Sequence, residues 1–364
     1  MRTIKSRSHE YTVGEYGSSR AALIAAVADR RPHVLIDRAV LDLLEPDVRA
    51  ALPADRLVVL EATETAKSYA ALEPVFLDLL GRGLRRNGVL VVVGGGVLQD
   101  VGCFIASVLA RGLRWELVPT TLLAQADSCI GSKSSINIGP YKNQLGTFYP
   151  PHRILLAADF LRSLPFDEIR SGLGEVIKLQ LLTSEEGFAE LMTELGGFRG
   201  MPPQDQLTLL AKWVGRSLDV KQPFIEKDEF DIGPRLLLNY GHTFGHAFES
   251  VTDFGIPHGI AVVLGMLTAT LVSARLGLVD ERHAVGLAHR LEAWHSPYAD
   301  LLAGVDMKAL FAALARDKKN TAPGLTCILT RGFGRMERTA LSVDQVETCV
   351  APALVDLISC RFKL

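Results

Sequence analysis

The chain has 364 residues, of which 48% are hydrophobic, 22% charged and 7% aromatic. This length suffices for two domains of ordinary size, and the composition excludes a largely disordered chain. The formal net charge of -2 provides no overall attraction to nucleic acid or to an anionic membrane, so we expect neither as a partner.

The cysteine pattern and the apolar stretches indicate the cellular compartment in which we expect the protein. Five scattered cysteines with no CxxC pair favour reduced thiols in a cytoplasmic protein over a disulfide framework. The N-terminal residues MRTIKSRSHEYTVG contain no apolar segment typical of a secretory signal. The most apolar uncharged stretch, 258–275, is shorter than the roughly 20 residues of a membrane span. We predict that it is a buried helix.

The first part of the chain alternates strand and helix patterns. Short aliphatic runs predict strands at 34–37, 57–61, 89–96 and 115–118. Helical spacing follows two of them, in ALEPVFLDLLGRGL and after Gly96. This alternation predicts a doubly wound α/β domain over residues 1–160, with its end shortly after the Tyr149-Pro150-Pro151 turn.

The second part, residues 161–364, is predicted to be a mostly α-helical domain. One hairpin is expected within GLTCILTRGFGRMERTAL. The predicted helices cover residues 166–184, 186–196, 204–221, 236–252, 258–277, 280–294 and 307–316.

A glycine-rich turn, GGGVLQD, joins the strand at 89–96 to the following helix. Glycines there allow the backbone to approach a pyrophosphate, and the helix N-terminus offers free N–H groups. The turn lacks the GxGxxG pattern, so a purely structural turn is the alternative. Asp37 ends an upstream strand, and Glu64 and Lys67 follow another, at positions where ribose and adenine contacts commonly lie.

Three segments of the second part contain residues suited to a metal site. His242 and His246 are four residues apart on one helix face, and His258 opens the next helix, where it can fold back against His242. In GLGEVIKLQLL, Glu175 lies in an apolar context that favours a functional carboxylate over an exposed ion pair with Lys178. Two histidines and one carboxylate leave coordination positions open for substrate, as in catalytic metal sites.

A Gly- and Ser-rich stretch, QADSCIGSKSSINIGPYKNQLGTFYPP, follows the Thr120-Thr121 pair. Small residues interspersed with lysines are typical of phosphate-binding loops. The alternative is a solvated lysine loop.

Taken in chain order, these motifs resemble the dehydroquinate synthase family, within the sugar phosphate cyclases. The similarity runs along nearly the whole chain and includes GGGVxxD, VPTTLLAQxDS, KNxxGTFYPP, SGLGEVIK, GHTFGHAxE, HGxAV and DKK. It implies the fold predicted above, a homodimer, bound NAD and one divalent metal, Zn or Co. Glu175, His242 and His258 match the family's metal ligands.

The resemblance also implies two further sets of site residues. The NAD contacts are Asp37, Glu64, Lys67, Gly95, Gly96, Asp100, Thr120, Thr121, Lys142 and Ser163. The substrate and phosphate pocket contains Lys178, Lys221, His246, Lys133 and Asp127 as catalytic residues, and Arg111, Asn143, Arg235, Asn239 and Lys318 or Lys319 as binding residues.

The implied activity is phosphate elimination and ring closure of a sugar phosphate, with NAD recycled, so the enzyme is a carbon–oxygen lyase. The family's usual GGKTGVN is GSKSSIN at residues 131–137, and the NAD-side threonine of FLxTLP is Ser163. Lys221, Arg235 and Asn239 are retained, which favours an acid heptulosonate phosphate and a 3-dehydroquinate synthase-like reaction. Sedoheptulose 7-phosphate, cyclised by a 2-epi-valiolone or 2-epi-5-epi-valiolone synthase type of enzyme, is the alternative. A metal-dependent polyol dehydrogenase and a catalytically silent binding protein remain as further hypotheses.

Overall fold

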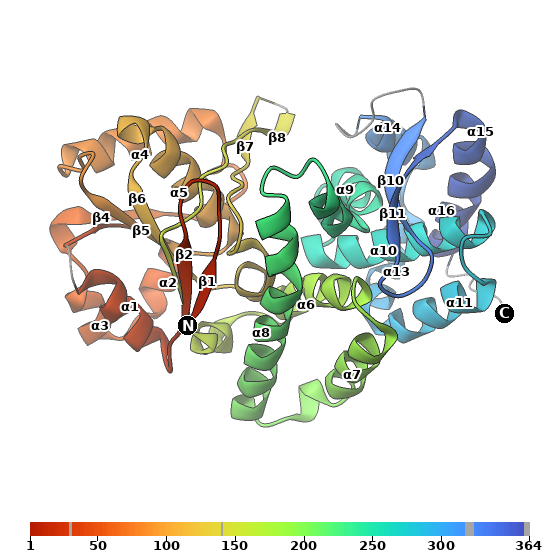
Figure 1. Cartoon of the computed structure of the whole chain (residues 1–364), viewed down its shortest axis with the longest axis horizontal. Helices are drawn as coiled ribbons and strands as arrows, with labels where there is room; N and C mark the ends of the chain where they lie inside the picture. The colour runs from red at the N-terminus through yellow and green to blue at the C-terminus, as the bar shows by residue number, and fades with distance from the viewer. Residues whose placement is uncertain (29–30, 140, 317–323, 360–364) are drawn as a thin grey trace. The chain divides into compact units, whose positions relative to one another are not determined.

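The computed structural model describes residues 1–28, 31–139, 141–316 and 324–359. The chain forms two compact units (Figure 1). Unit 1 consists of Met1–Pro165 and Pro202–Phe230, and unit 2 consists of Phe166–Met201 and Asp231–Leu364. The sequence predicts a single boundary near residue 160, whereas the chain in fact returns to unit 1 for Pro202–Phe230.

Unit 1 is built on a seven-stranded sheet in the order β1-β2-β9-β6-β5-β3-β4. Only β1 runs antiparallel to its neighbour β2, and the other pairs are parallel. The four strands predicted from aliphatic runs are confirmed, and the sequence missed β1, β2 and β9. The strands are β1 Arg2–Ile4, β2 Tyr11–Glu15, β3 His33–Asp37, β4 Leu57–Leu60, β5 Val89–Gly94, β6 Arg114–Pro119 and β9 Arg153–Leu156.

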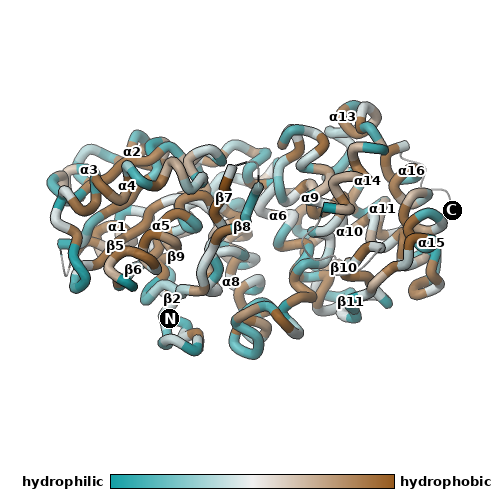
Figure 2. Tube along the Cα trace, turned by 90° about the horizontal axis from the view of Figure 1, so that it is seen from above, coloured by the Kyte–Doolittle hydropathy of each residue, from teal (hydrophilic) through white to brown (hydrophobic). Residues whose placement is uncertain are grey.

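Helices cover both faces of this sheet, as the doubly wound prediction requires. Val89, Val91 and Val93 of β5 pack in one apolar cluster with α1, α2 and α3. Val92 points to the other face, where a Cβ placed on Gly102 of α5 would meet its side chain at 2.3 Å. Burial on both faces explains why β5 is continuously apolar, and its trace has the hydrophobic colour in Figure 2. The helices are α1 Ser19–Val27, α2 Arg38–Leu43, α3 Pro46–Ala51, α4 Tyr69–Gly81 and α5 Gly96–Val108.

A hairpin, several short turns and one long helix complete unit 1. A two-stranded hairpin, β7 Ile136–Ile138 and β8 Tyr141–Leu145, lies within the Gly- and Ser-rich stretch. Short 3₁₀ turns form η1 Ala54–Arg56, η2 Leu109–Arg111 and η4 Ala158–Ser163, and a π-helical turn forms η3 Ala124–Ser128. The long helix α8, Pro203–Lys227, buries Trp213 in this unit.

Unit 2 is mostly helical around α10, His258–Arg275, which packs against α6, α9, α11, α16 and the strand β10. The predicted hairpin is confirmed as β10 Leu325–Thr330 and β11 Met336–Leu341. The other helices are α6 Phe166–Leu181, α7 Glu185–Leu195, α9 His242–Val251, α11 Glu281–Arg290, α12 Glu292–His295, α13 Ala299–Ala303, α14 Met307–Ala315, α15 Val343–Gln345 and α16 Ala351–Ile358, with short turns η5 Phe198–Gly200, η6 Pro234–Asn239, η7 Ser296–Tyr298 and η8 Val346–Val350.

One described helix, α10, is long and apolar enough to cross a membrane by length and composition alone. However, 83% of that apolar window is buried inside the protein, and the core helix of a soluble protein passes the same test. The prediction of a buried helix over this stretch is confirmed.

Candidate functional site

Glu175, His242 and His258 come together in unit 2 from three helices, α6, α9 and α10. The Nε2 atoms of His242 and His258 lie 3.4 Å and 3.1 Å from the same oxygen, Oε1 of Glu175. One ligand atom from each residue lies within 4.8 Å of the other two. This convergence of two imidazoles and a carboxylate fits a divalent metal of the zinc type.

The second ring nitrogen of each histidine is also bound. His242 Nδ1 lies 3.3 Å from the Tyr240 carbonyl oxygen, which can only accept, so Nδ1 carries the proton. His258 Nδ1 lies 3.2 Å from Glu249 Oε1. Such outer contacts orient a metal-binding imidazole and leave Nε2 free for the ion. Glu249 is not among the predicted site residues, although its position seven residues after His242 places it on the same helix face.

Glycines allow the three helices to approach closely enough for this arrangement. A Cβ on Gly174, next to Glu175, would lie 2.2 Å from the Gly259 carbonyl oxygen. A Cβ on Gly259, next to His258, would lie 1.7 Å from the Ser171 carbonyl oxygen. The Gly259 N–H donates to Ser171 Oγ at 3.0 Å, which joins α10 to α6 directly beside both ligands.

Glu175 is only 2% exposed, so its charge must be compensated. Burial opposes its ionisation, but Lys178 and His242 overcome that effect and hold the pKa of Glu175 well below its usual value. Burial lowers the pKa of His242. Burial also opposes the charge on His258, yet hydrogen bonds with Glu175 and Glu249 raise its pKa to about 10. Glu175 is therefore ionised, which is the state that a metal ligand requires.

The predicted pocket residues of unit 2 lie at different distances from this cluster. Lys178 forms a buried ion pair with Glu175 Oε2, so the alternative of an exposed pair is wrong. The ring of His246 is 5.4 Å and 5.9 Å from the rings of His242 and His258, between centroids, and it is exposed. Arg235 is buried in η6, and Asn239 of the same turn donates to the Leu236 carbonyl. Lys318 and Lys319 lie outside the described residues.

In unit 1, the glycine-rich turn opens α5 with Gly95 as its N-cap. A Cβ on Gly95 would lie 2.7 Å from Thr121 Cγ2, whereas one on Gly96 would meet nothing within 4 Å. Thr120 donates its backbone N–H to the Gly94 carbonyl at 3.0 Å. The bare backbone at the helix N-terminus therefore faces open space, which fits a pyrophosphate.

The candidate NAD residues after β4 contact the hairpin segment. Lys67 Nζ pairs with Asp100 Oδ2 at 2.6 Å, and burial raises the pKa of Asp100 although Lys67 opposes that shift. Glu64 Oε1 accepts from Asn137 Nδ2 at 2.8 Å and lies 3.7 Å from Lys142 Nζ. Asn137 is not among the predicted site residues, yet its side chain links the 131–137 loop to the candidate cofactor carboxylate of Glu64.

The other predicted residues of unit 1 occupy several separate places. Lys221 of α8 pairs with Asp127 Oδ1 at 2.5 Å, on the π-helical turn η3. Lys133 is exposed, with its Nζ 6.0 Å from the Phe148 ring centroid. The Asn143 N–H donates to Asn137 Oδ1 at 2.9 Å. Asp37 accepts from the Ala39 N–H as the N-cap of α2, and Ser163 ends η4. Arg111 is exposed, and no side-chain hydrogen bond or ion pair within the described part of the chain joins it to these residues.

Comparison with known proteins connects these features. Residues 57–171 match the model of the 3-dehydroquinate synthase N-terminal domain, and residues 172–320 match that of the C-terminal domain. A 3-dehydroquinate synthase of Paracoccus denitrificans (strain Pd 1222) is 35% identical over 341 residues, which cover 91% of this chain and 92% of that protein. The chain belongs to the 3-dehydroquinate synthase family. The resemblance inferred from the ordered motifs is confirmed.

Solved structures of two other synthases share the fold of this chain. The 2-epi-5-epi-valiolone synthase from Streptomyces hygroscopicus subsp. jinggangensis 5008, with NAD+ and Zn2+ bound, has a TM-score of 0.83 at 26% identity, covering 99% of this chain and 100% of that chain. A 2-deoxy-scyllo-inosose synthase, complexed with carbaglucose-6-phosphate, NAD+ and Co2+, has a TM-score of 0.79 at 20% identity, covering 98% and 99%. The second likeness shows the fold alone.

Proposed function

We propose that this protein is an NAD- and metal-dependent sugar phosphate cyclase, a carbon–oxygen lyase that eliminates phosphate and closes a carbocycle. The observation that carries the proposal is the convergence of two histidine Nε2 atoms on one oxygen of the buried Glu175. The membership of this chain in the 3-dehydroquinate synthase family supports the same reaction class.

The two groups required by this reaction would be held by separate sets of residues. Glu175, His242 and His258 would hold the metal, for which zinc and cobalt both suit two imidazoles and a carboxylate. The open backbone at Gly96, with the Lys67–Asp100 pair and Glu64, would hold NAD. When bound, NAD and the metal supply the reversible oxidation of a ring hydroxyl.

The chain's own side chains then serve the charged parts of the substrate. Lys178, Lys133 and Lys221 would supply positive charge for a departing phosphate. His246 is the histidine that the family resemblance assigns to the same phosphate pocket. Asp127 holds the ammonium group of Lys221 in place. Arg235 can bind a substrate carboxylate through two parallel N–H bonds, a geometry that only a guanidinium offers.

The retained residues Lys221, Arg235 and Asn239 favour an acid heptulosonate phosphate as substrate and 3-dehydroquinate as product. The alternative substrate, sedoheptulose 7-phosphate, rests on one segment of the chain. The 131–137 loop departs from the family pattern, and it contacts both Asp100, through the Ser135 N–H at 2.9 Å, and Glu64. A change in this loop would alter the substrate pocket together with the cofactor contacts.

To test this, the purified, metal-loaded enzyme is supplied with NAD and incubated separately with each of the two sugar phosphates, and phosphate release is measured. Release from the acid heptulosonate phosphate supports the first substrate, and release only from sedoheptulose 7-phosphate would exclude it. His242→Ala should abolish turnover, whereas His289→Ala, an exposed histidine of α11, should retain it. Net NADH production from a simple polyol, without phosphate release, would instead support a polyol dehydrogenase.

We further propose that the protein is a cytoplasmic homodimer. The four described cysteines, Cys103, Cys129, Cys327 and Cys349, are buried and form no disulfide with one another, which suits a reducing compartment. The family resemblance supports the dimer. Light scattering coupled to size-exclusion chromatography measures the mass directly, and a mass of one 39.6 kDa chain at micromolar concentration would contradict it.

A further inference from the structure

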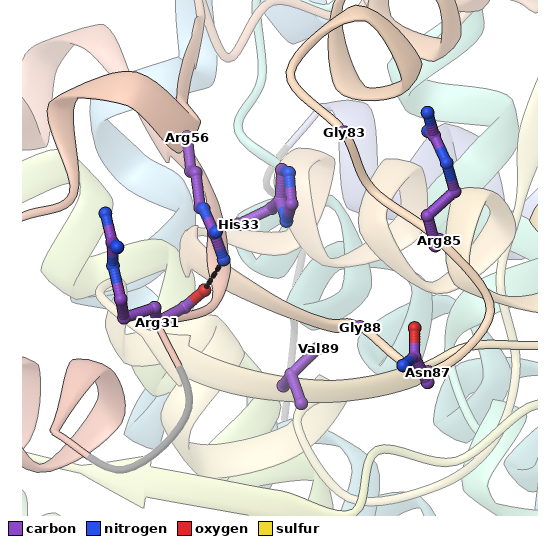
Figure 3. A pocket seen from close by; sticks show the side chains of 8 residues that line it. All are labelled: Arg31, His33, Arg56, Gly83, Arg85, Asn87, Gly88 and Val89. Atoms are coloured by element: carbon purple, nitrogen blue, oxygen red, sulfur yellow. Dashed lines mark hydrogen bonds between the residues drawn. The ribbon is translucent and has the colours of Figure 1, made fainter.

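A positively charged hollow of about 390 Å³ lies at the end of the unit 1 sheet where β3 and β5 begin (Figure 3). His33 opens β3, Val89 opens β5, and Arg56 directly precedes β4. The lining is completed by Arg31, Gly83, Arg85, Asn87 and Gly88. None of the described residues that line this hollow is acidic.

The charges around the hollow are only partly compensated. Asp55 lies 3.4 Å from Arg31 Nη2 and 3.6 Å from Arg56 Nε, so one carboxylate serves two guanidinium groups. Arg82, on the same connection as Arg85, is paired with Asp78 at 2.7 Å. Among the described residues, the ion pairs of the three lining arginines involve one carboxylate, that of Asp55, and the excess positive charge would be neutralised by an anion of charge -2.

Short bonds fix the polar groups of the hollow in place. Arg56 Nη1 donates to the Arg31 carbonyl at 2.5 Å, as the dashed line in Figure 3 shows. Arg85 Nη1 donates to the Leu84 carbonyl at 3.0 Å. The buried His33 donates from Nε2 to the Arg82 carbonyl at 3.0 Å. These bonds use only part of the five N–H donors that each guanidinium carries, so donors remain for a ligand.

We propose that this hollow binds the phosphate group of a small phosphate monoester. Guanidinium groups match phosphate oxygens in geometry and charge. The volume falls in the range of sites for small organic ligands, roughly 300–1,000 Å³, and exceeds what a bare phosphate requires. The basic run at residues 82–86 follows the end of α4, where cations also suit the helix dipole.

This hollow is separate from the candidate cofactor residues. Asp37 and the glycine-rich turn lie at the carboxyl ends of β3 and β5, whereas the hollow lies at their amino ends. Strands of five and six residues place roughly 16–20 Å between the two ends. A ligand at one end does not compete directly with a ligand at the other.

The test labels the arginines of the full-length protein with phenylglyoxal and quantifies each modified arginine by peptide mass spectrometry. Ribose 5-phosphate, inorganic phosphate and sodium chloride are compared at one ionic strength. Ribose 5-phosphate at a few times its dissociation constant should slow modification of Arg31, Arg56 and Arg85 by about threefold or more. Arg86, exposed and one residue from Arg85 but not part of the lining, should react at its original rate.

Two variants complete the test. Arg85→Gln should raise the ribose 5-phosphate concentration for half-protection of Arg56 by about tenfold, the effect expected for one lost charge-assisted bond. Arg86→Gln removes the same charge and should leave that concentration unchanged. Equal protection of Arg86, equal protection by inorganic phosphate, or no effect of Arg85→Gln would overturn the proposal. These arginines are not assigned to turnover, so failure of the cyclase assay leaves this outcome unaffected.

Discussion

Glu175 is an ionised carboxylate in the interior of unit 2, and its neighbours explain how the fold tolerates it. Lys178, three residues along the same helix, and the two histidines surround it with positive or hydrogen-bonding groups. Replacing one member of such a cluster leaves the others uncompensated. The cluster is therefore sensitive to single changes that keep the size of the side chain.

Glu175→Gln keeps that size and removes the negative charge. We expect the affinity for Zn²⁺ or Co²⁺ to fall by at least about 100-fold, because a direct ligand should matter more than an outer contact, for which 10–100-fold is typical. Titration of the metal-free protein with Co²⁺, followed by visible absorption, measures this. Glu168→Gln, exposed on the same helix, should bind as the unchanged protein does. Unaltered affinity in Glu175→Gln would exclude it as a ligand.

Glu249 provides a graded comparison, because it contacts His258 Nδ1 and lies on the far side of the ring from Glu175. Glu249→Gln should weaken metal binding by roughly 10–100-fold, less than Glu175→Gln. The same Co²⁺ titration ranks the two variants. A larger loss in Glu249→Gln would instead favour a metal position built from His246, Glu249 and His258, whose ligand atoms also lie within 4.8 Å of one another.

The buried thiols of unit 1 give a prediction that involves no ligand. Burial raises the pKa values of Cys103 and Cys129 to about 12, so at pH 8 only roughly one thiol in 10⁴ is the reactive thiolate. We expect iodoacetamide to leave both cysteines unmodified in the native protein at pH 8 and to modify both in denaturant. Mass spectrometry of the digested protein measures this, and rapid native labelling would show that the region opens.

Residue types and spacing predicted much of the site. The convergence of Glu175 with His242 and His258 is visible in the chain because all three lie on apolar helices in motifs of clear spacing. Asn137 and Glu249 could not be identified as site residues in the same way. Their roles depend on a hydrogen bond to one particular partner, Glu64 and His258 respectively, and spacing along the chain does not specify such a partner.

At the scale of elements, apolar periodicity located most helices, but it failed where one helix ends close to the next. The predicted helix at 236–252 is in fact the turn η6 followed by α9, which begins at His242. Gly241 has φ +82, a left-handed conformation that interrupts helical hydrogen bonding while the apolar pattern continues. The interruption places His242 in the first turn of α9, beside Glu175.

The contact between α6 and α10 is the element-scale feature most easily tested. Gly259→Ala would place a Cβ 1.7 Å from the Ser171 carbonyl, and backbone cannot move aside cheaply. We expect the free energy of unfolding to fall by about 3 kcal/mol, with weaker metal binding because His258 adjoins the displaced residue. Urea denaturation and the Co²⁺ titration measure the two effects.

Gly286→Ala is the matched control, because Gly286 also lies inside a helix and a Cβ there meets nothing within 4 Å. That change should leave metal binding intact and raise the stability by roughly 0.5–1 kcal/mol through helix propensity. Equal destabilisation by the two substitutions would show that close approach of α6 and α10 is not the cause.

At the scale of the whole molecule, the assignment of chain segments to units was the part that the sequence could not provide. Strand and helix periodicity identify elements, but a helix pattern does not indicate which core the helix joins. The helix α8 follows two helices of unit 2, yet its Trp213, Leu210 and Leu218 are buried in unit 1. Lys221 of the same helix pairs with Asp127, and Glu229 just beyond it accepts from Ser6 and Arg7.

These contacts predict that Met1–Pro165 alone does not form a stable domain. The fragment lacks the side chains of α8 that complete its core, and it leaves Asp127 without the lysine that neutralises it. We expect no cooperative thermal transition by circular dichroism. Joining Met1–Pro165 to Pro202–Phe230 through a flexible linker of about 20 residues should restore one. A fragment ending at Pro165 that melts as sharply as the joined form would show that α8 is dispensable for unit 1.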